Sequence, residues 1–336
     1  MVICRQWNMK IVTNLGDCVS GKVLSHQDQV DILLSTYNGF PYLADFLQSI
    51  RSQTFGAWNL IVRDDGSSDQ SVDFLDDFKG CYINRVEISI GKNNLGIINS
   101  LNEIYKLSKS PYVLFADQDD VWCEQKIELS LEKIKVFERE LGKDVPIVVF
   151  SDMEVTNEKL DLISPSFLSY MSLNPDWSQQ LKNLLIQNVA SGCSMMMNRA
   201  LFEKAFPIPS NAIMHDWWVM LVASAFGEIV YLNEATLKYR QHSNNTIGAR
   251  PIGFSLGWKL LLDNPGFIHD SIYSTQRQAR EMIRRYKGQL KPSDRELVKN
   301  YAYLSRKNFF NKWWVIIRYR FHKSSLAKSI VFYWLV

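Results

Sequence analysis

Residues 112–122 read YVLFADQDDVW, and they join a short apolar run to a cluster of carboxylates. The run from Tyr112 to Ala116 has the length and composition of a buried strand. Three aspartates, Asp117, Asp119 and Asp120, follow it within four positions. Carboxylates crowded at a strand end repel one another unless a positive charge lies between them. The stretch therefore predicts a strand that ends at a site for a cation.

Three units of strand, loop and helix precede this stretch. The strands are predicted at residues 30–36, 58–63 and 84–90. The helices behind them are predicted at residues 42–53, 71–78 and 97–108. Pro41 stands near the start of the first helix, and Ser and Asp residues are suited to cap the second. The repetition predicts a parallel sheet with helical crossovers.

Polar clusters follow the successive strands. They read STYNG from residue 35, RDDGSSD from residue 63, GKNN from residue 91 and DQDD from residue 117. Ligands of open parallel sheets bind in the crevice beyond the carboxyl ends of the strands. We therefore expect the four clusters to meet in one crevice.

The chain divides into three predicted parts. Residues 1–28 show no clear periodicity and are an N-terminal extension of uncertain order. Residues 29–250 form the α/β domain, in which a helix near residues 124–139 and a strand at residues 147–152 precede a mixed α+β portion. Residues 251–336 are helical, basic and aromatic.

Composition and charge exclude several classes of protein. With 336 residues and 46% hydrophobic content, the chain can bury a sizeable core. Its 38 Lys and Arg against 35 Asp and Glu give no overall case for nucleic-acid binding. The five cysteines are odd in number and lack metal-ligand spacing, so we expect unpaired thiols in a reducing cytosol. No targeting segment is evident, which favours a cytoplasmic protein.

The segment KNFFNKWWVIIRYRFHKSS, residues 307–325, alternates aromatic and basic side chains. No stretch reaches the roughly 18 apolar residues of a spanning helix. The pattern predicts a helix lying in an anionic membrane surface. A helix packed on the α/β domain, with solvated charges, is the alternative.

The D-x-D pair of Asp117 and Asp119 predicts a site for Mg²⁺ or Mn²⁺. Such cations prefer oxygen ligands and are commonly held by one or two carboxylates together with substrate phosphates. The alternative is a solvated turn in which Asp120 caps the following helix.

Six motifs resemble glycosyltransferase family 2, whose members are inverting GT-A enzymes that use nucleotide-diphospho-sugars. They are ILLSTYNG, IVRDDGSSD, NNLG, FADQDDVW, HDWW and YRQHSNN, and they span about Asp31 to Gly248 in the family's order. The last two most resemble bacterial transferases that use dTDP-L-rhamnose for cell-surface polysaccharide such as O-antigen or capsule. Related glucosyl- and galactosyltransferases share the earlier motifs. The resemblance implies a Rossmann-like, mostly parallel sheet flanked by helices, with a C-terminal helical extension.

The resemblance also assigns roles to residues. Asp216 in MHDWW matches the catalytic base, which takes the proton of the acceptor hydroxyl, and His215 replaces a common acidic residue. Asp119 matches the metal ligand, with Asp117 as a second ligand or a partner of the ribose. The remaining donor-binding residues implied are Thr36, Tyr37, Asp64, Asp65, Lys92, Asn94, Gly192, Trp217, Trp218, Arg240 and His242.

The implied reaction is a metal-dependent transfer of a hexose to a polyprenyl-diphosphate-linked saccharide at the inner face of the cell membrane. The implied donor is dTDP-rhamnose, with a UDP-hexose as the alternative. No Q-x-x-R-W signature of processive synthases is present, which favours one or few transfers. A sugar nucleotidyltransferase would have a glycine-rich basic loop near its N-terminus, and STYNGFPYL is not one. A non-catalytic glycan-binding protein is the third alternative.

Overall fold

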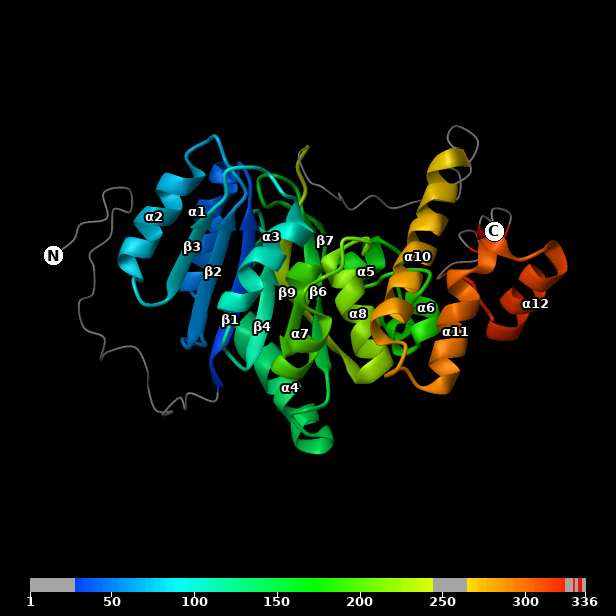
Figure 1. Ribbon diagram of the computed structural model, residues 1–336. Helices are drawn as coiled ribbons and strands as arrows, with labels where there is room; N and C mark the ends of the chain where they lie inside the picture. Colours follow the sequence, from blue (N-terminus) through cyan, green and yellow to red (C-terminus); the bar gives the residue numbers. More distant parts are fainter. Residues whose placement is uncertain (1–27, 244–264, 324–328, 330–331, 334–336) are drawn as a thin grey trace.

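The computed structural model describes residues 28–243, 265–323, 329, 332 and 333. The predicted N-terminal extension and the boundary at residues 250 and 251 therefore lie almost wholly outside the described residues. Within the described residues, the chain forms one nine-stranded sheet with helices on both faces (Figure 1).

The first half of the sheet is parallel, as predicted. The strand order is β3-β2-β1-β4-β8-β6-β9-β5, with β7 paired to β6. Strands β1, β2, β3 and β4 pair in parallel, so their carboxyl ends lie along one edge. Their bounds are Val30–Thr36, Trp58–Asp64, Val86–Ile90 and Tyr112–Ala116.

The second half of the sheet is mixed. Strand β8 lies antiparallel between β4 and β6, while β6 and β9 pair in parallel. The short strands β5 and β7 pair antiparallel with β9 and β6. The bounds are β5 Val121–Trp122, β6 Ile147–Thr156, β7 Leu162–Ser164, β8 Met195–Asn198 and β9 Glu228–Arg240.

Alternation along the strands divides the core into two layers. On β1, Leu33 belongs to one hydrophobic cluster, and its neighbours Ile32 and Leu34 belong to the other. Successive side chains of a strand point to opposite faces, so a strand buried on both faces reads as a continuous apolar run. The helices that cover the two faces are α1 Phe40–Arg51, α2 Ser71–Cys81, α3 Ile97–Ile104, α4 Lys126–Leu141, α7 Arg199–Ala205 and α8 His215–Phe226.

Short helical segments lie in the connections between these elements. They are α5 Phe167–Tyr170, α6 Leu181–Leu184 and the 3₁₀ helices η2 Tyr105–Leu107, η3 Pro175–Gln179, η4 Gly192–Ser194 and η5 Leu304–Arg306.

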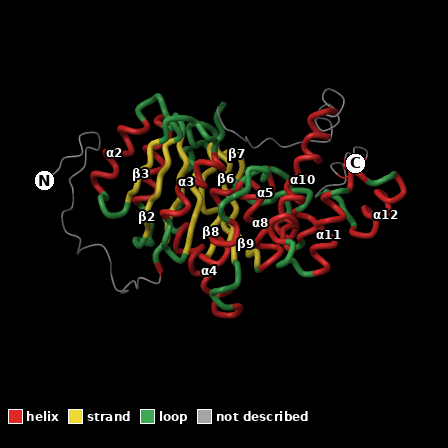
Figure 2. The backbone as a smooth tube through the Cα atoms, viewed as in Figure 1, coloured by secondary structure: helices red, strands yellow, loops and turns green. Residues whose placement is uncertain are grey.

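The C-terminal helices extend the molecule beyond the sheet. In Figure 2, α10 (Pro265–Tyr286), α11 (Pro292–Ala302) and α12 (Phe309–Tyr319) lie at the end opposite α2. Helix α10 packs on α8, where the rings of Trp218 and Tyr286 stack with their centroids 6.0 Å apart. Among the described helices, none combines the length and the apolar character needed to cross a membrane.

Three local predictions differ from the structure. Helix α2 has no side-chain cap at Gln70, and Asp69 instead accepts the Ser71 N–H at 3.0 Å. Asp120 is not a helix cap, because β5 follows it and α4 begins only at Lys126. Cys123 and Cys193 are free thiols, as predicted, whereas Cys81 is disulfide-bonded to a partner that lies outside the described residues.

Candidate active site

The loops after β1 and β4 are joined by Gln118, the middle residue of the D-x-D motif. Its Oε1 accepts hydrogen bonds from the Thr36 hydroxyl at 2.5 Å and the Tyr37 N–H at 2.9 Å. Its Nε2 donates to the Tyr37 carbonyl at 3.1 Å. A Cβ at Gly39 would lie 2.4 Å from the same Oε1, so a larger residue there would displace the Gln118 amide. Sequence reasoning missed Gln118, which lies in the turn after β4.

Asp64 and Asp65, at the end of β2, have different tasks. Asp64 is fully buried and accepts hydrogen bonds from the N–H groups of Gly66 and Ser67 at 3.1 and 2.8 Å, so it fixes its own turn. Asp65 Oδ2 accepts the N–H groups of Leu95 and Gly96, both at 2.8 Å. Asp65 thereby holds the loop after β3 against the end of β2.

The loop that Asp65 holds carries two predicted residues, Lys92 and Asn94. Both are exposed. Asn94 accepts the Gly96 N–H at 3.0 Å, and Gly96 has a φ of +77°, a conformation that favours glycine. The Lys92 ammonium is thus presented to solvent at the crevice edge.

The two aspartates of the D-x-D motif have different surroundings. Asp119 Oδ2 lies 2.8 Å from Nε2 of His242, and the Asp119 carbonyl accepts Nε of Arg240 at 2.9 Å. Burial, together with the charges of Asp119 and Asp216, raises the pKa of Asp117 to about 7. Asp216 therefore lies close enough to the D-x-D motif to interact with it electrostatically.

A cluster of mostly buried side chains lies beside the D-x-D motif. Oxygen and sulfur atoms of Asp117, Asp120 and Cys193 lie within 4.8 Å of one another. Both carboxylate oxygens of Asp120 are buried without a hydrogen-bond partner. Lys126 is fully buried nearby, where its Nζ donates to Thr236 Oγ1 at 3.3 Å and lies over the Trp122 ring. Burial lowers the pKa of Lys126 to about 8, and the charges of Cys193 and Asp120 oppose that shift.

Asp216 stands in the first turn of α8. Its Oδ2 accepts the Gly192 N–H at 3.2 Å, and Oδ1 accepts the Trp217 N–H. Burial raises the pKa of Asp216 to about 6, and these hydrogen bonds limit the rise. A carboxylate whose pKa lies near neutrality is suited to act as a general base.

His215 and Gly192 fix the position of Asp216. The His215 ring meets Phe115 of β4 edge-on, with centroids 4.8 Å apart. Burial lowers the pKa of His215 to about 4, so the ring is neutral at physiological pH. A Cβ at Gly192 would lie 2.3 Å from His215 Nε2, which explains the glycine.

Two predicted donor contacts are corrected by the structure. Trp218 is fully buried and donates its Nε1–H to the Ala205 carbonyl at 3.0 Å, so no ring face is open to a sugar. Arg240 is 4% exposed, and its guanidinium bonds to backbone or carboxylate oxygens of Asp119, Glu158 and Asp45. Arg240 thus positions Asp119 instead of reaching into the crevice.

Trp217 remains partly exposed and donates Nε1–H to the Leu184 carbonyl at 2.6 Å. His242 lies against Asp119, where its ring stacks on Tyr42 with centroids 4.4 Å apart. Sequence reasoning missed Tyr42, whose position in α1 resembles that of any helix residue facing solvent.

The donor atoms at the end of β4 fit a divalent cation. A carboxylate oxygen of Asp119 and an imidazole nitrogen of His242 converge, and Asp117 lies beside them. Carboxylate oxygens with an imidazole nitrogen suit Mn²⁺, and carboxylates suit Mg²⁺. The charges of Asp119 and Asp216 both raise the pKa of Asp117, a crowding of carboxylates that favours an added positive charge.

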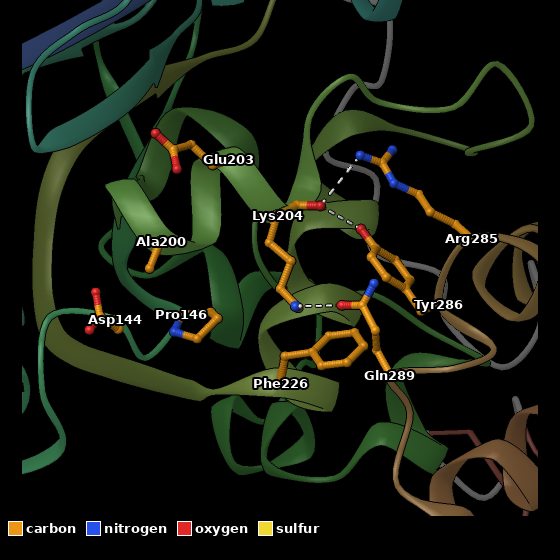
Figure 3. Close-up of a pocket in the computed structure, with 9 residues that line it drawn as sticks. All are labelled: Asp144, Pro146, Ala200, Glu203, Lys204, Phe226, Arg285, Tyr286 and Gln289. Carbon is orange, nitrogen blue, oxygen red and sulfur yellow. Dashed lines mark hydrogen bonds between the residues drawn. The ribbon is translucent and has the colours of Figure 1, made fainter.

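A pocket elsewhere in the fold contains none of the predicted residues. It lies beside Lys204 and Phe226 and includes Pro146, which precedes β6 (Figure 3). Because β6 runs in the direction of β4, this pocket lies at the opposite edge of the sheet from the carboxylates. It does not belong to the candidate active site.

Known proteins share both the sequence pattern and the fold. The chain is 24% identical over 242 residues to the dTDP-rhamnosyl transferase RfbG of Shigella flexneri, covering 68% of this chain and 78% of that protein. It is 22% identical over 197 residues to the UDP-Glc:alpha-D-GlcNAc-diphosphoundecaprenol beta-1,3-glucosyltransferase WfgD of Escherichia coli, covering 57% of this chain and 69% of that protein.

The fold is similar to that of the mannosyltransferase PcManGT from Pyrobaculum calidifontis, solved with GDP-Man and Mn²⁺. The TM-score is 0.53 at 13% identity, over 85% of this chain and 72% of that chain. The described sheet and its flanking helices are thus those of a GT-A glycosyltransferase. Residues 31–206 match the model of glycosyl transferase family 2, and with the strand-end carboxylates in place we conclude that the chain belongs to this family.

Proposed function

We propose that the protein transfers L-rhamnose from dTDP-L-rhamnose to a lipid-linked saccharide, with inversion at the anomeric carbon and with a divalent cation bound at the D-x-D motif. The observation that carries the reaction is the partly buried Asp216 carboxylate, held by the Gly192 N–H beside Asp117. The Asp216 carboxylate has a raised pKa and lies close to the carboxylates of the D-x-D motif, which face the donor in this proposal.

Asp216 accepts the proton of the acceptor hydroxyl in this reaction. As that proton leaves, the hydroxyl oxygen forms a bond to the anomeric carbon of the donor sugar. The bond from this carbon to the diphosphate oxygen breaks, and its electron pair leaves with the nucleoside diphosphate. One such displacement inverts the configuration.

Asp119 and Asp117 hold the cation in this proposal, and His242 binds it or orients Asp119. The cation supplies positive charge that stabilises the departing diphosphate. Arg240 and Tyr42 hold the side chains of Asp119 and His242 in position. Arg240 lies 5.1 Å over the Tyr42 ring, and His242 stacks on that ring.

Asp65 and the loop it holds form the base-binding side of the crevice in this proposal. Asp65 Oδ1 lies 3.4 Å from Nη2 of Arg63 and accepts no hydrogen bond from the described residues, so we assign this oxygen to the pyrimidine N–H. Asp64 is saturated by its own turn and acts as a positioning residue. In this proposal Tyr37, Lys92 and Asn94 line the entrance, and Gly192 and Trp217 lie on the sugar side. Thr36 is buried and supports the entrance through its hydrogen bond to Gln118.

The sugar and the acceptor in this proposal are inferred from the names of the relatives. RfbG is named for dTDP-rhamnose, and WfgD for a diphosphoundecaprenol acceptor. A UDP-hexose remains the alternative donor because WfgD uses UDP-Glc. A lipid-linked acceptor requires the enzyme to work at the inner face of the cell membrane.

Nucleotide release by the purified protein tests this proposal. The donors are dTDP-rhamnose, UDP-glucose, UDP-galactose and UDP-N-acetylglucosamine, each with Mn²⁺, Mg²⁺ or EDTA and a synthetic lipid-diphosphate-linked acceptor. We expect release from dTDP-rhamnose that requires metal and acceptor. Asp119→Ala and Asp216→Asn should each reduce it by about a hundredfold or more.

Asp176→Asn is the matched control, because Asp176 is an exposed acid in the first turn of η3. It should leave release unchanged. Release from a UDP-hexose alone would replace the rhamnose assignment and keep the mechanism. If Asp216→Asn retains full turnover, the assignment of the base is wrong, and absence of release with every donor would favour a non-catalytic glycan-binding role.

A further inference from the structure

Charge is unevenly distributed along the chain. Residues 297–336 contain eight Lys and Arg and no Asp or Glu. The other 30 Lys and Arg share residues 1–296 with all 35 Asp and Glu. The net charge of the whole chain is thus close to zero, although residues 1–296 are acidic overall and residues 297–336 are strongly basic. Such an asymmetry is typical of chains that bind an anionic surface.

Helix α12 lies in this basic region and has two apolar faces. Its inner face is packed, with Val315 and Ile316 only 1% and 5% exposed. Tyr319 anchors it to α11 by donating to Glu296 Oε1 at 2.9 Å and accepting from Asn300 at 3.1 Å. The packed inner face and the hydrogen bonds of Tyr319 therefore hold α12 on the protein, and its outer side chains are not needed for this.

The outer face of α12 presents large apolar side chains to solvent. Phe310, Trp314 and Ile317 stand at the i, i+4 and i+7 positions of one row and are 82%, 58% and 69% exposed. Phe309 and Trp313 form the adjacent row, 67% and 36% exposed, with ring centroids 6.3 Å apart. An exposed contiguous apolar patch of this kind marks an interaction site.

Cations border this outer face. Arg306 and Arg318 are exposed at the two ends of the helix, and Arg320 follows its last turn. Figure 1 places α12 at the extremity of the molecule farthest from α2 and β3, so the sheet does not obstruct approach to it. Aromatic side chains flanked by Lys and Arg suit the boundary between headgroups and acyl chains of an anionic bilayer.

We propose that the outer face of α12, formed by Phe309, Phe310, Trp313, Trp314 and Ile317, docks the protein on a bilayer that contains anionic lipid. The bilayer is favoured over a second copy of the chain because the flanking charges are all positive, and two such faces would repel each other. It is favoured over a spanning arrangement because α12 has 11 residues and one face already packed on the protein. The inference deepens the proposed function, since it names the element that brings the enzyme to a lipid-linked acceptor.

Vesicle co-sedimentation of the full chain tests the docking face. The vesicles contain phosphatidylcholine alone or phosphatidylcholine with 30% phosphatidylglycerol. The wild type should bind the anionic vesicles, and 0.5 M salt should weaken that binding. Phe310→Ser combined with Trp314→Ser should weaken it by about tenfold or more. Arg306→Glu with Arg318→Glu should weaken binding to anionic vesicles specifically.

Matched controls change similar side chains elsewhere. Ile83→Ser with Leu162→Ser removes two apolar side chains that are 73% and 58% exposed outside this region. Lys109→Glu with Lys143→Glu reverses two exposed charges. Both control variants should bind vesicles like the wild type, and thermal unfolding checks that every variant folds.

Three results would overturn the docking proposal. The first is absence of wild-type binding to anionic vesicles at low salt, and the second is equal binding by the Phe310→Ser, Trp314→Ser variant. The third is a wild-type dimer in sedimentation velocity that this variant converts to a monomer, which would make the face a contact between copies. Nucleotide release is measured in parallel, so that vesicle binding without release refutes the proposed function alone, and release without vesicle binding refutes the docking face alone.

Discussion

At the scale of single residues, Asp216 combines a catalytic position with an energetic cost. Burial raises its pKa from 3.8 to about 6, so the native state binds the proton more tightly than the unfolded chain does. Between these two pKa values the unfolded state holds fewer protons, and stability therefore falls as the pH rises through this range. At pH 7 the full cost of a buried carboxylate charge is present.

The Asp216→Asn variant should separate stability from activity. Removing the charge should raise the free energy of unfolding at pH 7 by up to about 3 kcal/mol, because one pKa unit corresponds to about 1.4 kcal/mol. Denaturant unfolding at pH 7 and pH 4 measures this gain, which should shrink at pH 4. A variant that is inactive and also less stable than the wild type at pH 7 would contradict the assignment of the buried charge.

The same pKa predicts the pH dependence of turnover. A general base works only when deprotonated, so kcat/KM should fall tenfold per pH unit below about pH 6. Initial rates from pH 4.5 to 8 at saturating metal would show this limb. A flat profile across pH 5 to 7 would speak against Asp216 as the base.

At the scale of elements, the contact between η4 and the start of α8 sets the site. Gly192→Ala should push His215 aside, because the new Cβ would lie 2.3 Å from Nε2 and the ring is already packed on Phe115. Overpacking of this kind costs about 1–3 kcal/mol and should also displace Asp216. The unfolding temperature and the rate of nucleotide release should both fall. Gly80→Ala is the control, since its Cβ meets no atom within 4 Å, and it should be neutral or slightly stabilising.

The elements of the first half followed from local pattern. Strand β1 lies at the residues predicted, and helix α1 begins within two residues of its predicted start. Buried parallel strands are continuous apolar runs, and amphipathic helices repeat at 3.6 residues, so both leave a strong local signal. Strand β8 left no local signal that distinguished it, because Met195, Met196 and Met197 form an apolar run that could belong to a strand or a helix. Its antiparallel insertion between β4 and β6 depends on long-range pairing.

At the scale of the whole molecule, substrate binding should be visible as stabilisation. A ligand that binds only the native state raises its stability by about 2.7 kcal/mol at a hundredfold excess over Kd. We expect Mn²⁺ and dTDP together to raise Tm by several degrees, with little effect from either alone and loss of the shift in EDTA. Asp119→Ala should abolish the joint shift, whereas Asp176→Asn should preserve it. A full shift with dTDP in EDTA would argue against metal-mediated binding.

The sequence by itself determined the parallel half of the sheet and the strand-end position of the carboxylates, because apolar periodicity and clustered polar residues are local properties of the chain. Its motifs also resemble those of the glycosyltransferase family to which it belongs. Only the tertiary structure decided which of these side chains can act. It buried Trp218 in the core, fixed Arg240 to the Asp119 backbone and set His242 against the Asp119 carboxylate. The contacts of Asp119 with Arg240 and His242 join residues 121 and 123 positions apart, and the burial of Trp218 depends on the face of α8 that it occupies. Packing between distant elements, which no local pattern encodes, therefore selected the working residues.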